Sequence, residues 1–202
     1  MQILIATHNA GKVRELTTML QGLDLMPVSL NEVGITHDVA ETGDTFRQNA
    51  VLKAIAYARL SGRLTLADDS GLEVDALDGA PGVYTKRFGG ANLSQAQRNA
   101  LLLDRLRDIS PPQRGARFRC VIALAGSDGT VLAVTEGVCE GEIAAASAGE
   151  QGFGYDPVFY LPDRGVTMAQ LTAAEKEIIS HRGRALRAMA PMLAQAAQQF
   201  QK

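Results

Sequence analysis

The stretch Leu66-Ala67-Asp68-Asp69-Ser70-Gly71 determines how the rest of this chain is interpreted. The apolar run from Leu64 to Ala67 predicts a strand that ends in two adjacent carboxylates. Ligands of open α/β sheets bind in the crevice at the carboxyl ends of the strands. Adjacent carboxylates repel each other unless a cation lies between them, and hard divalent cations prefer oxygen ligands. The stretch therefore indicates a metal site, with a polar turn as the alternative, because Asp, Ser and Gly are common turn residues.

The composition is that of an ordinary globular protein, with 46% hydrophobic and 21% charged residues among 202. This length suffices for one domain with a sizeable core, or for two lobes that share one sheet. The formal net charge of −2 gives no basic footprint for a nucleic-acid duplex, although a local basic pocket can still bind small anions. Cys120 and Cys139 indicate neither a disulfide framework nor a cysteine-based zinc site.

The sequence shows no signal for export or membrane insertion. The opening residues Met1 to Ile5 lack a basic region of the kind that begins a signal peptide. No apolar run approaches the roughly 20 residues of a membrane helix. We therefore expect a cytoplasmic protein that binds no membrane.

The N-terminal region predicts a strand from Gln2 to Ala6, a tight loop, and a helix with apolar residues at helical spacing from Val13 to Leu23. A helix N-terminus offers unpaired backbone N–H groups, and Lys12 adds a positive charge beside them, so this segment suits a phosphate. It is not a Walker A loop, since no glycine stands five residues before Gly11. The alternative is an ordinary strand-to-helix connection.

A second helix is predicted from Thr45 through Arg59, after a loop and short strand within residues 31–39. Asn49 and Lys53 are four residues apart and share one face of this helix. Glu41 lies in the turn just before it. Taken alone, the pair is equally compatible with a solvated polar stripe.

The middle of the chain predicts further strands and one helix. The expected elements are a strand from Leu72 to Leu77, a Gly/Pro-rich loop from Gly79 to Gly90, a helix from Ser94 that stops before Pro111, and a hairpin that joins Phe118–Ala125 to Val131–Val138.

A second dense stretch runs from Gly152 to Tyr160. Phe153 lies between glycines that let the backbone approach a flat ligand, and base–aromatic stacking is worth about 1–3 kcal/mol. The alternative is a bent core strand. A capping box at Thr172 begins a short helix that carries Lys176. A last helix follows from about His181, and Pro191 should kink or restart it.

These motifs occur in an order that resembles the inosine/xanthosine triphosphate pyrophosphatase family. The resemblance rests on Thr7-x-Asn9-x-x-Lys12, Glu41 to Ala54, Ala67-Asp68-Asp69-Ser70-Gly71-Leu72, Gly79 to Tyr84, Gly152-Phe153-Gly154-Tyr155-Asp156-Pro157 and Ser180-His181-Arg182. It implies an α/β fold with a mixed, elongated central β-sheet flanked by helices, and two lobes with the active-site cleft between them. Residues 1–202 would form a single domain of this kind.

The resemblance also implies the chemistry. The expected reaction is Mg²⁺-dependent hydrolysis of ITP, dITP and XTP to the monophosphate and pyrophosphate by a homodimer. Asp69 is implied as the general base and, with Glu41, as a metal ligand. The implied phosphate contacts are Thr7, His8, Asn9, Ala10, Gly11, Lys12, Lys53 and Ser70. The implied base contacts are Phe153, Gly154, Tyr155, Asp156, Lys176, His181 and Arg182.

Selectivity for deaminated purines has a simple physical basis. Hypoxanthine and xanthine carry a 6-oxo group where adenine carries an amine, so a donor such as Arg182 or His181 would favour the former. His8 stands where some family members have Gly. Two alternatives stay open: a pyrophosphatase for other modified nucleotides, and a nucleotide-binding regulatory module without turnover.

Overall fold

The computed structural model describes residues 1–199, which form a seven-stranded sheet in the order β2-β1-β3-β4-β5-β6-β7. β1 pairs in parallel with β2 and β3, whereas β6 pairs antiparallel with β5 and β7. The strands are β1 (Gln2–Ile5), β2 (Met26–Ser29), β3 (Leu64–Val74), β4 (Gly115–Ala125), β5 (Val131–Ile143), β6 (Phe159–Leu161) and β7 (Val166–Thr167). The helices are α1 (Ala10–Met19), α2 (Phe46–Ser61), α3 (Gln95–Arg105), α4 (Ala173–Ile179) and α5 (His181–Gln199). The predicted α/β class, a mixed sheet flanked by helices, is confirmed.

The chain divides into two compact units. Unit 1 comprises Met1–Asp69, Cys120–Gly137 and the segment from Arg182 onward, and unit 2 comprises Ser70–Arg119 and Val138–His181. The boundaries fall within β3, β4 and β5 and at the start of α5, so each of these elements contributes residues to both units.

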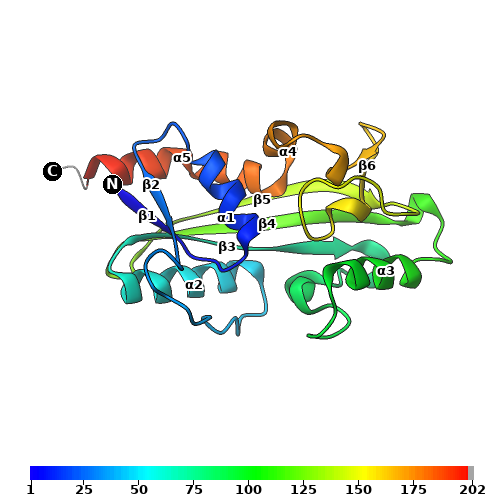
Figure 1. The fold of residues 1–202 in the computed structure, drawn as a ribbon, viewed down its shortest axis with the longest axis horizontal. Helices are drawn as coiled ribbons and strands as arrows, with labels where there is room; N and C mark the ends of the chain where they lie inside the picture. The colour runs from blue at the N-terminus through cyan, green and yellow to red at the C-terminus, as the bar shows by residue number, and fades with distance from the viewer. Residues whose placement is uncertain (200–202) are drawn as a thin grey trace. The chain divides into compact units, whose positions relative to one another are not determined.

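Unit 1 is built on the alternation of side chains along its strands. Successive side chains of a strand point to opposite faces. Ile3, Ile5, Leu64 and Leu66 are buried in one cluster with residues of α1 and α5. Figure 1 shows α1 and α5 on one face of these strands and α2 on the other. Two apolar layers therefore cover the strands of this unit.

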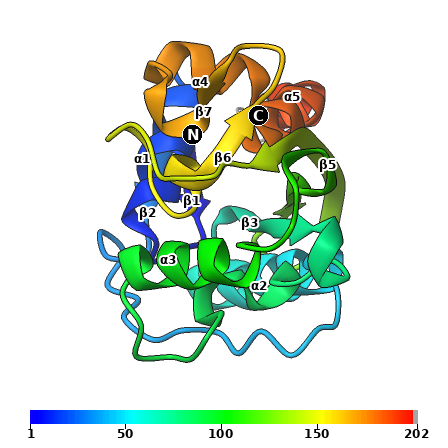
Figure 2. The same cartoon turned by 90° about the vertical axis from the view of Figure 1, so that its right-hand side faces the viewer.

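Unit 2 has a separate apolar core. It includes Leu72 and Val74 of β3, Leu102 of α3 and the aromatic pair Phe118 and Phe159, whose ring centroids lie 4.4 Å apart. Figure 2 shows α3 and α4 on opposite sides of the strands of this unit. This core fixes the segment that follows β5.

The structure corrects the predicted strands. β3 runs without interruption from Leu64 to Val74, so the polar turn considered for residues 68–71 is wrong. The Asp side chains at these positions are buried and find charged partners, and tertiary contacts override their low strand propensity. The short strand expected within residues 31–39 is also wrong. The strand lies earlier, at β2, where Met26–Ser29 pairs in register with β1.

The predicted starts of α2, α3 and α4 are confirmed, and so is the glycine at the end of α2. Thr45 caps α2 in a capping box with Gln48, and Gly62 ends that helix at φ 62°. Ser94 and Thr172 begin α3 and α4 with capping boxes of the same kind. Each cap satisfies backbone N–H groups that the first helical turn leaves without partners.

α5 continues through Pro191 to Gln199 and does not restart at the proline. Pro191 lacks the N–H that would bond within the helix. Met189 and Leu193 flank it and are fully buried in the core of unit 1. Packing on both sides of the proline therefore holds the helix together.

None of the described helices is both long and apolar enough to cross a lipid bilayer.

Leu66→Ala tests the core of unit 1. Leu66 is fully buried on β3, so we expect its truncation to lower the free energy of unfolding by about 2–5 kcal/mol. Leu132→Ala is the matched control, because Leu132 is 46% exposed on β5, and we expect it to change stability by less than about 1 kcal/mol. Urea unfolding followed by circular dichroism measures both, and equal losses would contradict the assignment of the core.

Candidate active site

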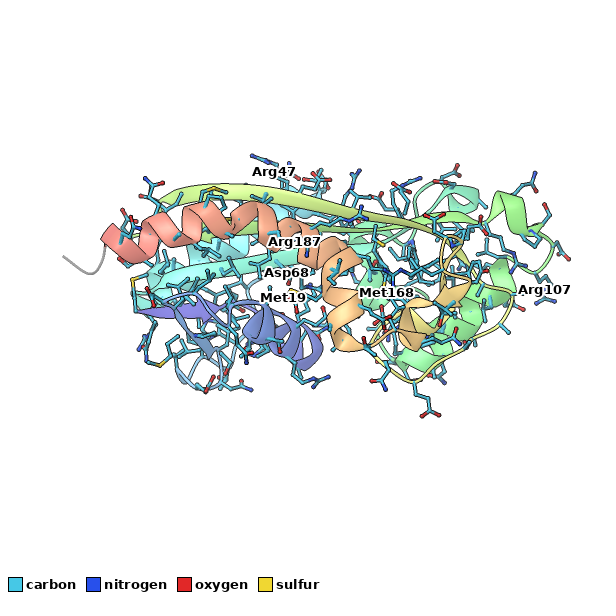
Figure 3. The ribbon with its side chains drawn as sticks, turned by 90° about the horizontal axis from the view of Figure 1, so that it is seen from above. Met19, Arg47, Asp68, Arg107, Met168 and Arg187 are labelled. Carbon is cyan, nitrogen blue, oxygen red and sulfur yellow. The ribbon has the colours of Figure 1, made fainter. Side chains whose placement is uncertain are left out.

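Asp68 and Asp69 are neighbours on β3, and their side chains have different surroundings. Asp68 continues the row of Leu64 and Leu66, which face α1 and α5. Figure 3 labels Asp68 in the region of unit 1 flanked by these two helices. Asp69 contacts Lys53 of α2 instead. The period of two along a strand therefore gives each carboxylate its own set of partners.

Asp68 is a fully buried anion held by two cations. Lys12 Nζ lies 3.0 Å from its Oδ1, and Arg182 Nε and Nη2 each lie 3.1 Å from its Oδ2. Burial by itself would raise the pKa of Asp68, but the charges of Lys12, Arg182 and Lys53 outweigh it and hold that pKa far below its usual range. Asp68 is therefore a permanent carboxylate.

The guanidinium of Arg182 is buried between two carboxylates. Its Nη1 donates to Glu15 Oε2 at 2.5 Å, while Nε and Nη2 face Asp68, and the side chain is 1% exposed. The sequence placed Arg182 at a base edge beside His181. In the structure Arg182 contacts the carboxylates of Asp68 and Glu15, and its predicted role as a base-edge donor stays a prediction.

Glu15 is a residue that the sequence analysis missed. It lies three positions after Lys12 on α1, so both side chains project from the same face of that helix. Through Arg182 and Asp68 the four residues form a chain of alternating charges. The spacing of three residues places Glu15 on the same helix face as Lys12 and could have indicated it, but Arg182, the partner of Glu15, is distant in sequence.

The segment from Thr7 to Lys12 forms the N-terminus of α1, as predicted. Asn9 is the N-cap, and its Oδ1 accepts hydrogen bonds from Gly11 N (2.9 Å) and Lys12 N (3.2 Å). Thr7 Oγ1 in turn accepts from Asn9 N at 3.2 Å. The cap therefore already satisfies the N–H groups of Gly11 and Lys12, and the predicted phosphate contacts of this segment stay a prediction. His8 lies beside this turn, with Nε2 3.3 Å from the carbonyl oxygen of His37.

Lys53 joins two carboxylates on the α2 side of β3. Its Nζ lies 2.5 Å from Glu41 Oε1 and 3.1 Å from Asp69 Oδ1. Burial by itself would lower the pKa of Lys53, but the charges of Asp69, Asp68 and Glu41 outweigh it and raise that pKa. Lys53 is therefore a buried, protonated ammonium, and the sequence prediction that it shares a site with Glu41 and Asp69 agrees with this geometry.

Asp69 is buried, and its two carboxylate oxygens have different surroundings. Burial raises the pKa of Asp69, and the lowering effect of the Lys53 charge does not cancel it. Its Oδ2 is buried and, within the described chain, accepts no hydrogen bond. Leaving a buried carboxylate oxygen without a hydrogen bond costs free energy, so such an oxygen calls for an explanation, for example a bound water or ion. Asp69 is thus the carboxylate of this cluster that is available to a water or a cation.

Glu41 and Asp69 fit a hard divalent cation. Across the described residues no group of three or more His, Cys, Asp or Glu side chains is arranged to hold a metal ion. Mg²⁺ does not require one, since it commonly uses one or two carboxylates together with substrate phosphates and waters. The carboxylates of Glu41 and Asp69, which both lie beside Lys53, meet that requirement.

Unit 2 contains a second buried ion pair beside an aromatic ring. Lys176 Nζ donates to Asp156 Oδ2 at 2.5 Å and lies 4.8 Å from the centroid of the Phe153 ring. Phe153 N donates to the same Asp156 oxygen at 2.8 Å. A Cβ at Gly152 would lie 2.1 Å from that oxygen, so only glycine fits there. The structure brings together three of the residues predicted to hold a base.

The other predicted base contacts of unit 2 are Tyr155, Gly154 and His181. Tyr155 is 2% exposed, and its hydroxyl donates to the carbonyl oxygen of Thr85, while burial raises its pKa to about 12. Gly154 accepts a hydrogen bond from Asn99 Nδ2 through its carbonyl oxygen. His181 stacks on Phe118, with ring centroids 4.8 Å apart. Asn99 was missed, because nothing in its local pattern distinguishes it from a solvated helix residue.

Ser70 follows the two Asp residues on β3 and is half-buried at the start of unit 2. Its predicted phosphate contact stays a prediction.

Comparisons with known proteins cover most of the chain. The sequence model of the Ham1 family matches residues 3–192. A protein of Geobacillus kaustophilus named dITP/XTP pyrophosphatase is 51% identical over 185 residues, which are 92% of this chain and 90% of that protein. One of the same name from Desulforamulus reducens is 49% identical over 187 residues, 93% and 92% of the two chains. The solved structure of a HAM1 protein from Coxiella burnetii superposes with a TM-score of 0.86 at 40% identity and covers 96% of this chain and 99% of that one.

Arg182→Met tests the buried charge chain of unit 1. Removing one partner of a buried ion pair leaves an uncompensated charge, so we expect the free energy of unfolding to fall by about 3–5 kcal/mol at pH 7. The lowered pKa of Asp68 means that its contribution is fully present above the unfolded-state pKa of about 3.9 and is lost as the pH falls below it. The deficit of the variant should therefore shrink in acid.

Urea unfolding at pH 7 and pH 3 measures this effect. Arg184→Met is the matched control, since Arg184 lies on the same helix but is exposed, and we expect it to change stability by less than about 1 kcal/mol. A loss for Arg182→Met no greater than that of the control would contradict the buried pairing.

Proposed function

The chain belongs to the Ham1 family, and from this premise we propose that it is an enzyme that hydrolyses ITP, dITP and XTP to the nucleoside monophosphate and pyrophosphate. Relatives that match nearly the whole chain are named dITP/XTP pyrophosphatases. The observation that carries the proposal is the cluster of half-buried Glu41 with buried Lys53 and Asp69, in which Oδ2 of Asp69 accepts no hydrogen bond within the described chain. A pure binding module has no need of a buried carboxylate available to water.

Asp69 is the proposed general base. It accepts the proton of the attacking water at Oδ2, the oxygen without a hydrogen bond within the described chain. The pKa raised by burial makes it a stronger base than an exposed Asp. Lys53 holds the other oxygen, Oδ1, at 3.1 Å and so fixes the direction of the carboxylate. Water activation is thus assigned to one oxygen and positioning to the other.

Lys12 and Lys53 supply positive charge for the triphosphate. Phosphoryl transfer depends on positioning and on stabilising charge that develops on the phosphoryl oxygens. Both ammonium groups are largely buried, so solvent screens them less than surface lysines. We propose that the segment from Thr7 to Lys12 contacts phosphate. The side chains of Thr7, His8 and Lys12 would donate, with Ala10 and Gly11 shaping the turn, since Asn9 caps the N–H groups of Gly11 and Lys12.

We propose Mg²⁺ as the cofactor, held by Glu41 and Asp69. When bound, it would neutralise phosphate charge and polarise the scissile phosphoryl group. On this face of β3 the carboxylates of Glu41 and Asp69 both approach the ammonium of Lys53, so two carboxylates lie close together there. Such oxygen ligands are those that Mg²⁺ prefers.

The base is assigned to unit 2. Phe153 offers a ring face for stacking, and the buried pair of Asp156 and Lys176 offers an acceptor and a donor beside that ring. Gly154, Tyr155, His181 and Arg182 complete the proposed set. A positive donor such as Lys176 favours a 6-oxo group over an amine, because a buried polar group left unpaired discriminates strongly.

We further propose a cytoplasmic homodimer that acts on free nucleotides and binds no nucleic acid. The support is the family resemblance together with a net charge of −2, which gives no basic surface for a duplex. Light scattering tests the dimer, and a shift assay with duplex DNA at physiological salt tests the absence of nucleic-acid binding.

A nucleotide panel tests the reaction. We expect rapid pyrophosphate release from ITP, dITP and XTP with Mg²⁺, little release from ATP or GTP, and loss of activity when EDTA removes the metal. Separate assays of pyrophosphate and orthophosphate identify the bond that is cleaved. Orthophosphate as the product, or equal rates on all five nucleotides, would contradict the proposal.

Asp69→Asn tests the general base. Loss of a positioned base costs roughly 10²- to 10⁴-fold, so we expect kcat for ITP to fall by about that factor while the far-ultraviolet circular dichroism spectrum is unchanged. Asp24→Asn is the control, because Asp24 is an exposed residue before β2. Near-normal kcat in Asp69→Asn would remove Asp69 from this role.

A further inference from the structure

The segment that precedes α2 runs back along one face of that helix, so that earlier residues of the segment contact later positions of the helix. Asn49, Lys53 and Tyr57 are spaced four residues apart, so their side chains lie along a single face of the helix. Each contacts a different part of residues 37–43, a segment without helix or strand. In Figures 1 and 2 this segment runs alongside α2. We call it the strap.

Tyr57 binds the beginning of the strap. Its hydroxyl accepts a hydrogen bond from Val39 N at 3.1 Å and donates one to the carbonyl oxygen of His37 at 3.2 Å. The side chain is 2% exposed, so its ring is fixed within unit 1. His8 Nε2 lies 3.3 Å from the same His37 oxygen. One hydroxyl thus satisfies both a donor and an acceptor of the strap backbone.

Asn49 binds the end of the strap. Its Oδ1 accepts from Gly43 N at 2.8 Å, and Asn49 is 2% exposed. A Cβ at Gly43 would lie 2.6 Å from Gln48 Cβ and 2.8 Å from Asn49 Oδ1, so the approach requires glycine. The next two backbone amides, those of Asp44 and Thr45, donate to Gln48 Oε1. The strap is therefore fixed at both ends.

Glu41 lies between these two attachments. Its carboxylate meets Lys53, the middle member of the row on α2. The backbone of Glu41 belongs to no helix or strand, so its position depends on the residues that hold the strap. A carboxylate on an unattached loop would sample many positions, and fixing it costs conformational entropy at each binding event.

We propose that Tyr57 and Asn49 are positioning residues that hold the strap along α2 and so place the carboxylate of Glu41 beside Lys53 and Asp69. This rests on the proposed function for its link to Mg²⁺. The positioning itself concerns only hydrogen bonds of unit 1. Neither Tyr57 nor Asn49 touches the reacting atoms in this scheme.

Tyr57→Phe removes only the hydroxyl and keeps the buried ring. We expect faster hydrogen exchange at the amide of Val39 and across residues 37–43, with unchanged protection in the middle of α2. Tyr84→Phe is the matched control, because Tyr84 is 57% exposed and belongs to unit 2. Unchanged exchange of the strap in Tyr57→Phe would overturn the proposal, whether or not the protein hydrolyses any nucleotide.

Mg²⁺ dependence provides the second readout. If the strap is correctly placed only part of the time, the apparent Kd for the metal rises as the inverse of the fraction that remains correctly placed, whereas saturating metal restores the rate. We expect the Mg²⁺ concentration for half-maximal activity to rise about three- to tenfold, with kcat at saturating Mg²⁺ within about twofold of wild type. A general loss of stability would instead lower the active fraction without shifting this midpoint.

A double-mutant cycle tests whether Tyr57 acts through Glu41. In the Glu41→Gln background, Tyr57→Phe should cause no further rise in the Mg²⁺ midpoint, because the group that it positions is already altered. If the two substitutions shifted the Mg²⁺ midpoint additively, the proposal that Tyr57 acts through Glu41 would be overturned. Calorimetric titration of Mg²⁺ into the same variants gives this comparison without turnover. A wild type that binds Mg²⁺ but turns over no nucleotide would therefore count against the proposed function and leave the positioning test intact.

Discussion

The alternation of side chains along β3 is the constraint on which the proposed site depends. The buried carboxylates of two consecutive residues would repel each other strongly if both side chains lay on the same face of the strand. Because successive residues of a strand face opposite sides, Asp68 meets Lys12 and Arg182 beneath α1 and α5, and Asp69 meets Lys53 of α2. A shift of the pairing register by one residue would exchange these environments. The hydrophobic residues Leu64 and Leu66 fix that register, so the core of unit 1 also fixes the chemistry.

The two faces of β3 differ in their charge. On one face two carboxylates, Asp68 and Glu15, meet two cations, which makes a compensated buried network of the kind that orients side chains. On the other face Lys53 contacts both Glu41 and Asp69, and Oδ2 of Asp69 accepts no hydrogen bond within the described chain. The first arrangement holds Asp68 as an ion-paired carboxylate, and the second leaves one oxygen of Asp69 without a hydrogen bond. Two residues with identical side chains thus differ in their partners through the helices that cover them.

Local signals in the sequence predicted the helices, and tertiary contacts explain what those signals missed. The capping boxes at Thr45 and Ser94 are complete within four residues, so the sequence alone identified both helix starts. The uninterrupted course of β3 was not predictable in the same way. Residues 68–71 have turn-forming side chains, and only their burial and charged partners keep them in the strand. β2 was missed because its four residues include Pro27 and become a strand by pairing with β1.

The separation of partners along the chain explains which parts of the site were predictable. Lys53 lies 12 residues from Glu41 and 16 from Asp69, so three neighbouring motifs indicated one cluster. Arg182 lies 114 residues from Asp68 and 167 from Glu15, and no local pattern carries information about such contacts. The predicted base contact of Arg182 rested on its place in the Ser180-His181-Arg182 motif, and these two carboxylate partners were not predicted. Residue types predicted the chemistry of this chain, whereas the direction of each side chain required the fold.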